Sequence, residues 1–287
     1  MTTHSIKNIL AAMDNSKENR SLFKEALALA SSMRAKVVVT SITPRYEGNM
    51  NRVFLNDAEK QLEIPLKTVL DEAGEYASSL GLQMSTLHRV GKPSDEISAI
   101  AHEMNADLIL LGCSKRLQVE RILLGRTTIE VICNGPCDVM LLPEDREISF
   151  ERILVGINGS AESLEAGVRA LGLASSYGGE VHAVYATDLS TDRLLRYGAM
   201  RDAEQKGWKI LQEFLTLSRE YEAPVITAVR GNLPESSLVE YAREKKINLI
   251  ALGAPKEHWG LEMFFGSVIE RITSLAQCPI LIAKKSE

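Results

Sequence analysis

The stretch IKNILAAMDNS at residues 6–16 is matched 144 positions later by FERILVGINGS at residues 150–160. Each stretch is an apolar run followed by a short polar turn and then by a helix-like segment. A short apolar run with these flanks is typical of a buried strand in a parallel sheet, whose crossover connection is usually a helix. The pair therefore predicts the same α/β unit at two places in one chain.

The correspondence continues through both halves of the chain. The segments AKVVVTSITP and GEVHAVYATD are again 144 positions apart, whereas the later pairs are 141 apart. A net loss of three residues after the second strand explains the change of offset, and the pairs together indicate an internal duplication. The later pairs are GKPSDEISAIAHEMNADLILLG with GNLPESSLVEYAREKKINLIALG, and CDVMLLP with CPILIAK.

The alternation of segments within each half predicts the fold class. Short runs rich in Val, Ile and Leu alternate with amphipathic stretches, which is the pattern of a doubly wound α/β fold. We predict two tandem, Rossmann-like domains with five-stranded parallel sheets, at residues 1–146 and 147–287, joined near the charged stretch LPEDREISF. The expected strands are 6–13, 36–42, 83–90, 107–112 and 138–142, and then 151–157, 180–186, 224–230, 248–253 and 279–283.

The composition is that of an ordinary globular protein and argues against several functions. The 287 residues are 45% hydrophobic and 25% charged, with a formal net charge of −5. The sequence has no block of five or more Lys or Arg residues, so we expect no nucleic-acid partner. No apolar stretch approaches the roughly 18 residues of a membrane helix, and the first residues lack the apolar core of a signal peptide. We therefore expect a cytoplasmic protein without a membrane contact.

Cysteine and histidine residues form no pattern of a metal centre. The four cysteines include no Cys-x-x-Cys pair, and the five histidines are scattered along the sequence. In a chain of this length, cysteines in such positions are typical of reduced thiols. The sequence leaves open whether Cys113, beside the end of the fourth strand, is a redox-sensitive thiol or a small buried residue.

Ligands of doubly wound folds bind beyond the carboxyl ends of the strands, where the strand order reverses. The stretch GAPKEHWGLEMFFGS at residues 253–267 leaves such an end and precedes a helix-like segment. Its glycines would let backbone N–H groups approach a phosphate, and the helix dipole would favour that anion. The residues at the strand ends are Asp14 and Asn158 for the first strand, Ile42 and Ala186 for the second, and Gly112 and Gly253 for the fourth.

These residues resemble the universal stress protein family, and the resemblance covers nearly the whole chain twice. Members that bind ATP carry Gly-x2-Gly-x9-Gly-[Ser/Thr] after the fourth strand and an Asp after the first. The second half keeps Gly253, Gly266 and Ser267, with Lys256 at the second glycine and Asn158 at the Asp position. The first half keeps three of the family's residues and departs at two, and its pattern is Asp14, Gly112, Lys115, Gly125 and Arg126, followed by Thr127.

The resemblance implies a site for ATP or another adenine nucleotide, with or without Mg²⁺, on a fold like that of nucleotide α-hydrolases. The implied binding residues of the second half are Asn158, Ala186, Gly253, Lys256, Gly266, Ser267 and Val268. A weaker site in the first half would use Asp14, Ile42, Gly112, Lys115, Gly125, Arg126 and Thr127.

Charge and motif fidelity favour different halves. The loop from Lys115 to Arg126 has a net charge of +3, whereas the loop from Lys256 to Ser267 has −1. Exposed charges are screened over about 8 Å at physiological salt, whereas backbone donors act at contact distance. We therefore predict that nucleotide binds chiefly in the second half, where the ammonium of Lys256 could pair with a phosphate.

Simpler structural roles stay open for the same residues. The segments 267–270 and 127–130 read Ser-x-x-Glu and Thr-x-x-Glu, and both are capping boxes, so either hydroxyl could cap a helix without touching a ligand. Asp14 and Asn158 could likewise serve only to turn the chain into the following helix.

The sequence shows no motif of a known catalytic site. It lacks Gly-x-Ser-x-Gly, His-Glu-x-x-His and Gly-x4-Gly-Lys-[Ser/Thr], so we expect no enzyme or at most a weak ATPase. The resemblance implies a stress-response protein that binds an adenine nucleotide and acts as a regulatory or interaction module. It also implies an intrachain pseudo-dimer of the two halves and allows a homodimer, while the protein partner stays unknown. The alternatives are a protein with degenerate sites that acts through protein contacts alone, and a slow ATP hydrolase.

Overall fold

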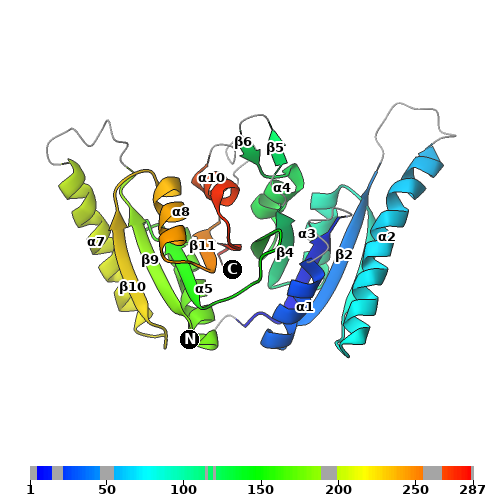
Figure 1. Ribbon diagram of the computed structural model, residues 1–287, viewed down its shortest axis with the longest axis horizontal. Helices are drawn as coiled ribbons and strands as arrows, with labels where there is room; N and C mark the ends of the chain where they lie inside the picture. Colours follow the sequence, from blue (N-terminus) through cyan, green and yellow to red (C-terminus); the bar gives the residue numbers. More distant parts are fainter. Residues whose placement is uncertain are drawn as a thin grey trace. The chain divides into compact units, whose positions relative to one another are not determined.

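The computed structural model describes residues 5–14, 22–45, 55–113, 116–118, 121–188, 199–254 and 267–285 (Figure 1). The predicted α/β fold is confirmed, and the ten expected strands lie within two residues of their predicted bounds. Contacts divide the described residues into two compact units, 5–113 with 125–147, and 148–285 with 116–118 and 121–124. The division of the domains at residues 146 and 147 stays a prediction.

The first half forms a parallel sheet in the order β3-β2-β1-β4-β7. Its strands are β1 (Asn8–Met13), β2 (Lys36–Pro44), β3 (Ser85–Gly91), β4 (Leu108–Cys113) and β7 (Asp138–Pro143). The connecting helices are α1 (Leu22–Met33), α2 (Leu55–Ser79), α3 (Pro93–Glu103) and α4 (Arg126–Asn134).

The second half repeats this arrangement with the order β10-β9-β8-β11-β12, again parallel. Its strands are β8 (Arg152–Gly156), β9 (Glu180–Ala186), β10 (Val225–Arg230), β11 (Leu249–Gly253) and β12 (Ile280–Ala283). Its helices are α5 (Ala161–Tyr177), α7 (Ala199–Ser218), α8 (Pro234–Glu244) and α10 (Val268–Leu275).

The strand order of the second half reverses between β8 and β11. The connections β8–β9 and β9–β10 run through α5 and α7, which pack together, whereas the helices on the way to β11 and β12, α8 and α10, pack together. This is the doubly wound arrangement, in which the two crossover directions separate at the first and fourth strands. The carboxyl ends of β8 and β11 therefore border the place where such folds bind ligands.

Burial of the central strands explains why short apolar runs form this sheet. Ile153, Leu154 and Val155 of β8 are fully buried, because helices cover both faces of a parallel sheet. Helix α5 starts at the N-cap Ser160 and stops at Gly178, whose φ of 69° suits a left-handed residue without a side chain. Pro234 opens α8 at a position where a helix tolerates proline, as the sequence predicts.

One element is not expected from the sequence. Strands β5 (Arg116–Gln118) and β6 (Arg121–Leu123) pair as an antiparallel hairpin in the loop that follows β4. None of the ten predicted strands falls on these residues, so the hairpin is an addition to the predicted fold.

None of the described helices is both long enough and apolar enough to cross a bilayer.

Candidate functional site

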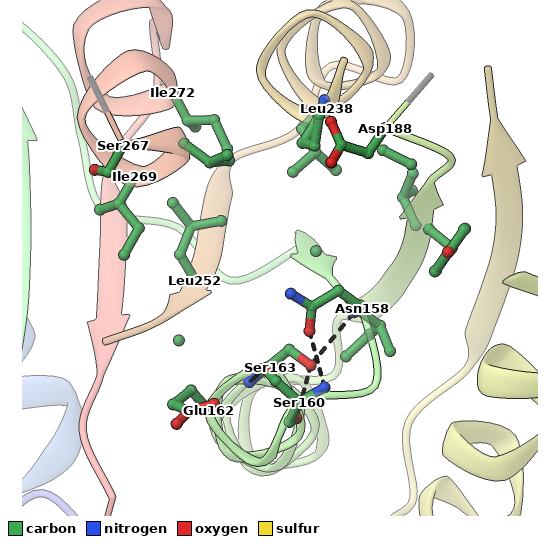
Figure 2. A pocket seen from close by; sticks show the side chains of 18 of the residues that line it. Asn158, Ser160, Glu162, Ser163, Asp188, Leu238, Leu252, Ser267, Ile269 and Ile272 are labelled. Atoms are coloured by element: carbon green, nitrogen blue, oxygen red, sulfur yellow. Dashed lines mark hydrogen bonds between the residues drawn. The ribbon is translucent and has the colours of Figure 1, made fainter. Parts of the chain in front are cut away.

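A pocket of about 870 Å³ lies at the carboxyl ends of β8, β9 and β11 in the second half (Figure 2). The N-terminal turns of α5, α8 and α10 and one residue of α7 complete its wall. Its position is the reversal of strand order, because β8 and β11 are the strands between which the chain changes direction. The apolar part of the wall comes from residues such as Ile157, Leu238 and Leu252.

Residues predicted to bind nucleotide meet in this pocket. Asn158, Ala186, Gly253, Ser267 and Val268 all line it, although they come from four separate parts of the second half. The other two, Lys256 and Gly266, lie outside the described residues. The fold therefore brings the predicted set together, while contact with a ligand stays a prediction.

Asn158 begins a hydrogen-bonded turn into α5 (Figure 2). The backbone N–H of Ser160 donates to Oδ1 of Asn158 at 2.9 Å, and the backbone N–H of Asn158 donates to Oγ of Ser163 at 3.3 Å. Ser160 in turn caps the helix by accepting from the backbone N–H of Ser163 at 3.1 Å. Asn158 therefore does turn the chain into α5. This turn uses its Oδ1, and its Nδ2 amide faces the pocket (Figure 2).

Ser267 is the N-cap of α10, as the Ser-x-x-Glu pattern predicts. Its Oγ accepts a hydrogen bond from the backbone N–H of Glu270 at 3.2 Å. A capping hydroxyl uses an oxygen lone pair and keeps its own hydrogen, so Ser267 can still donate to an acceptor in the pocket. The helix N-terminus adds a partial positive charge at the same place.

Gly253 has a packing role that the motif did not reveal. A Cβ atom built at this glycine would lie 2.4 Å from the backbone carbonyl carbon and oxygen of Glu162. The glycine therefore allows the end of β11 to pack against the first turn of α5, independently of any phosphate.

The motif missed several charged and polar residues of the pocket. Arg271 stands four positions after Ser267, and this helical spacing would have placed it on the same side of α10. Its Nη1 donates to Oε1 of the buried Glu235 at 2.6 Å. Lys206 of α7 and Asp188, which follows β9, also line the pocket. Asp188 follows the predicted strand 180–186 by two residues, so the rule of strand ends could have found it, whereas no sequence signal places Lys206.

Thr187 is a further polar residue of the pocket that the motif missed. It lines the pocket, is 6% exposed, and its Oγ1 has no hydrogen-bond partner among the described residues. The equivalent Thr43 of the first half bonds through Oγ1 to Nε2 of His88 at 2.8 Å. Val229 stands at the position equivalent to His88, which explains why the second hydroxyl is left unpaired.

The described residues contain no cluster of three or more His, Cys, Asp or Glu side chains that could hold a metal ion. The four cysteines are thiols and not members of disulfides, and Cys113 at the end of β4 is buried.

Both halves of the sequence match one known protein family. The model of the universal stress protein family matches residues 5–143 and again residues 149–284. The chain belongs to the universal stress protein family. A universal stress protein of Methanocaldococcus jannaschii is 30% identical over 142 residues, which are 47% of this chain and 83% of that protein.

Solved structures of universal stress proteins share the fold along the full chain. A universal stress protein of Archaeoglobus fulgidus aligns with 99% of this chain and 98% of its own, with a TM-score of 0.75 at 17% identity. A functionally unknown protein of Pseudomonas aeruginosa covers 98% of this chain and 94% of its own, with a TM-score of 0.66 at 15% identity. At these identities the likeness bears on the fold alone.

Helix α4 of the first repeat is equivalent to α10 of the second repeat, but its N-terminus is capped differently. Its N-cap is Gly125, with no side-chain cap, so the prediction that Thr127 caps α4 is wrong. Thr127 is the second helical residue, because the helix starts one residue earlier, at Arg126. Gly125 has an ordinary φ of −62°, and a Cβ there would meet only Oγ1 of Thr128 at 3.9 Å.

Cations of the first repeat are neutralised by a buried carboxylate. Glu130 accepts hydrogen bonds from Ser94 Oγ and from Arg126 Nε at 2.9 Å, and it pairs with Lys92 Nζ at 3.1 Å. These partners, Ser94 first, lower the pKa of Glu130 from 4.5 to about 2, so the group is ionised at neutral pH. The guanidinium of Arg126 is therefore paired with Glu130, and its contact with a nucleotide stays a prediction.

The other residues of the weaker site lie at or near the ends of strands. Asp14 follows β1 and is exposed, and Gly112 is the penultimate residue of β4. Strand β2 continues two residues beyond Ile42, which is therefore a buried strand residue and not its last one. Lys115 lies outside the described residues.

Proposed function

We propose that the second half binds an adenine nucleotide, ATP or a close relative, in the pocket at the ends of β8, β9 and β11. One observation carries the proposal: Asn158, Ala186, Gly253 and Ser267, which a family motif singles out, line a single pocket. Its volume of about 870 Å³ is within the roughly 300–1,000 Å³ of small-molecule sites. The apolar wall offers contacts for a base, and the helix N-termini offer donors for phosphates.

The phosphates would lie at the N-terminus of α10. The Ser267 hydroxyl, the first backbone N–H groups of the helix and the Arg271 guanidinium are three kinds of donor on this side of the pocket. Charge-assisted hydrogen bonds from arginine to phosphate are among the stronger contacts a protein makes. Lys256, at the motif's second glycine position, is proposed as a further phosphate partner.

The proposed biological role is that of a stress-response regulatory or interaction protein in the cytoplasm. Membership of the universal stress protein family supports this role. Where Mg²⁺ accompanies the nucleotide, the phosphates would supply ligands to it. The intrachain pseudo-dimer and a homodimer of the chain stay predictions.

Calorimetric titration of the full chain with ATP, ADP and AMP tests the proposal. Gly266→Ala should lower ATP affinity at least tenfold, or about 1.4 kcal/mol, because a methyl group would obstruct close approach of the backbone to phosphate. Gly125→Ala is the matched control, since neither its φ nor a neighbour within 3.9 Å resists a Cβ.

The outcomes separate the alternatives. If Gly125→Ala is the more damaging change, the nucleotide binds in the first half. A folded protein that binds no nucleotide at millimolar concentration would contradict the proposal and favour action through protein contacts alone. Release of inorganic phosphate from ATP and Mg²⁺ would instead indicate the slow hydrolase.

A further inference from the structure

Asp188 is a carboxylate in the pocket of the second half, and the first half has no carboxylate at the equivalent position. It follows β9 by two residues, is exposed, and lines the pocket (Figure 2). Its φ of 53° is left-handed, a conformation that Asp tolerates better than most residues, and it turns the chain as it leaves the strand. The equivalent residue of the first half is Pro44, the last residue of β2, which has no acceptor to offer a ligand through its side chain.

The carboxylate is available to a ligand. The structure records no hydrogen bond or ion pair between the Asp188 side chain and any described residue, Lys206 of the same pocket included. An ionised carboxylate only accepts hydrogen bonds, so it favours a ligand atom that carries a hydrogen and repels a phosphate.

The opposite side of the pocket has the reverse character. Ser267 and Arg271 belong to α10, which follows β11, whereas Asp188 follows β9, and Figure 2 shows Ser267 and Asp188 on opposite sides. Strand β8 separates β9 from β11 in the sheet, so the two strand ends are about 10 Å apart, or two strand spacings. One side of the pocket thus donates to anions, and the other accepts from hydrogen-bond donors.

We propose that Asp188 accepts a hydrogen bond from the nucleoside end of the bound nucleotide and thereby sets both its orientation and its selectivity. The inference rests on the proposed nucleotide function of this pocket. Phosphates near Asp188 would meet an unpaired negative charge, so the nucleotide binds with its phosphates at α10. The group that donates to Asp188 is either the 6-amino group of the adenine or a hydroxyl of the ribose, and both are neutral hydrogen-bond donors.

Two substitutions remove the carboxylate without straining the backbone. Asp188→Asn removes the charge and keeps a residue that tolerates the left-handed region, and Asp188→Gly removes the side chain where glycine is favoured. Asp202→Asn is the matched control, because Asp202 is an exposed carboxylate of α7 that does not line the pocket. Circular dichroism and melting curves check that each protein is folded.

Calorimetry on the full chain with ATP, 2′-deoxy-ATP and purine riboside triphosphate tests the proposal. The wild type should bind one of the two analogues at least tenfold more weakly than ATP: the deoxy analogue if Asp188 binds the ribose, or the analogue without the 6-amino group if it binds the base. Asp188→Gly, which removes the acceptor, should lose about tenfold in ATP affinity and bind ATP and that analogue equally. Asp188→Asn, whose Oδ1 still accepts a hydrogen bond, should lose less, and Asp202→Asn should match the wild type.

Failure of this inference is distinguishable from failure of the proposed function. An Asp188→Gly variant that binds ATP as tightly as the wild type or more tightly, or a wild type that does not discriminate against either analogue, overturns the role of Asp188 and leaves nucleotide binding intact. Folded proteins that bind no nucleotide overturn both.

Discussion

Helices α4 and α10 occupy equivalent places after the fourth strand of each repeat, yet one equivalent position near their starts carries opposite charges. Position 130 in α4 is a buried glutamate held by Ser94, Arg126 and Lys92, whereas the equivalent position 271 in α10 is an arginine. The partner position on the preceding helix is exchanged as well, because Ser94 corresponds to Glu235, which pairs with Arg271.

This exchange shows why the charge of a loop is a poor guide to an anion site. The loop of the first half is the more basic by sequence, but Arg126 is paired internally and a carboxylate lies beneath the helix start. The loop of the second half is slightly acidic, but an arginine lines the pocket. Both arginines pair with a buried glutamate, so the net charge of a loop does not show which of its cations stay available to a ligand.

The packing of Gly253 should give the strongest effect of a single substitution. Gly253→Ala should destabilise the protein by about 3 kcal/mol, because its Cβ would collide with backbone atoms of Glu162 that cannot move away cheaply. Gly172→Ala in α5 is the control, since nothing lies within 4 Å of its Cβ, and it should stabilise slightly. Chemical denaturation measures both. A Gly253→Ala protein of normal stability with weakened ATP binding would assign Gly253 to the phosphate instead.

Glu130 gives the next largest effect. Glu130→Gln should cost about 2 kcal/mol near neutral pH, because Ser94, Arg126 and Lys92 lose a charged acceptor. A carboxyl whose pKa falls from 4.5 to about 2 on folding stabilises the native state above pH 4.5, and this contribution is lost as pH falls towards 2. Denaturation of wild type and variant between pH 7 and 2 should show converging stabilities. Parallel profiles would contradict the ionised cluster.

Arg271 is the test of the phosphate end of the second site. Arg271→Gln should weaken ATP binding by about 1.5 kcal/mol, or roughly tenfold, and weaken AMP binding less, since a longer phosphate chain makes more charged contacts. Arg243→Gln is the matched control, because Arg243 is an exposed arginine of the second half that does not line the pocket. If calorimetry shows that both variants lose the same ATP affinity, Arg271 acts only through its long-range charge and makes no direct contact with the phosphates.

The smallest expected effect separates the two equivalent threonines. Thr43→Val should cost about 1 kcal/mol, because His88 loses a hydrogen-bond partner at a buried site. Thr187→Val should leave stability unchanged or slightly raised, since it removes a buried hydroxyl that bonds to no described residue. Thermal melts of the two variants side by side decide this point. A comparable loss for Thr187→Val would mean that its hydroxyl has a partner after all.

The architecture and the position of the pocket follow from local patterns in the sequence. Duplicated apolar runs predicted ten strands within two residues, because buried parallel strands and their helices have local patterns. The rule of strand ends placed Asn158, Ala186 and Gly253 at one pocket, and the Ser-x-x-Glu spacing identified Ser267 as a cap, since a cap depends on neighbours three residues away.

The hydrogen-bond and ion-pair partners of the site residues cannot be read from the sequence, because they depend on the tertiary structure. Glu130 meets Ser94 across 36 positions and Arg271 meets Glu235 across the same separation, so no local pattern reveals which charges are neutralised. The packing of Gly253 against Glu162, the unpaired hydroxyl of Thr187 and the pocket position of Lys206 likewise depend on elements that are distant in sequence. Hydrogen bonds and ion pairs act at contact distance, and contacts between distant segments exist only once the sheet and its helices have assembled.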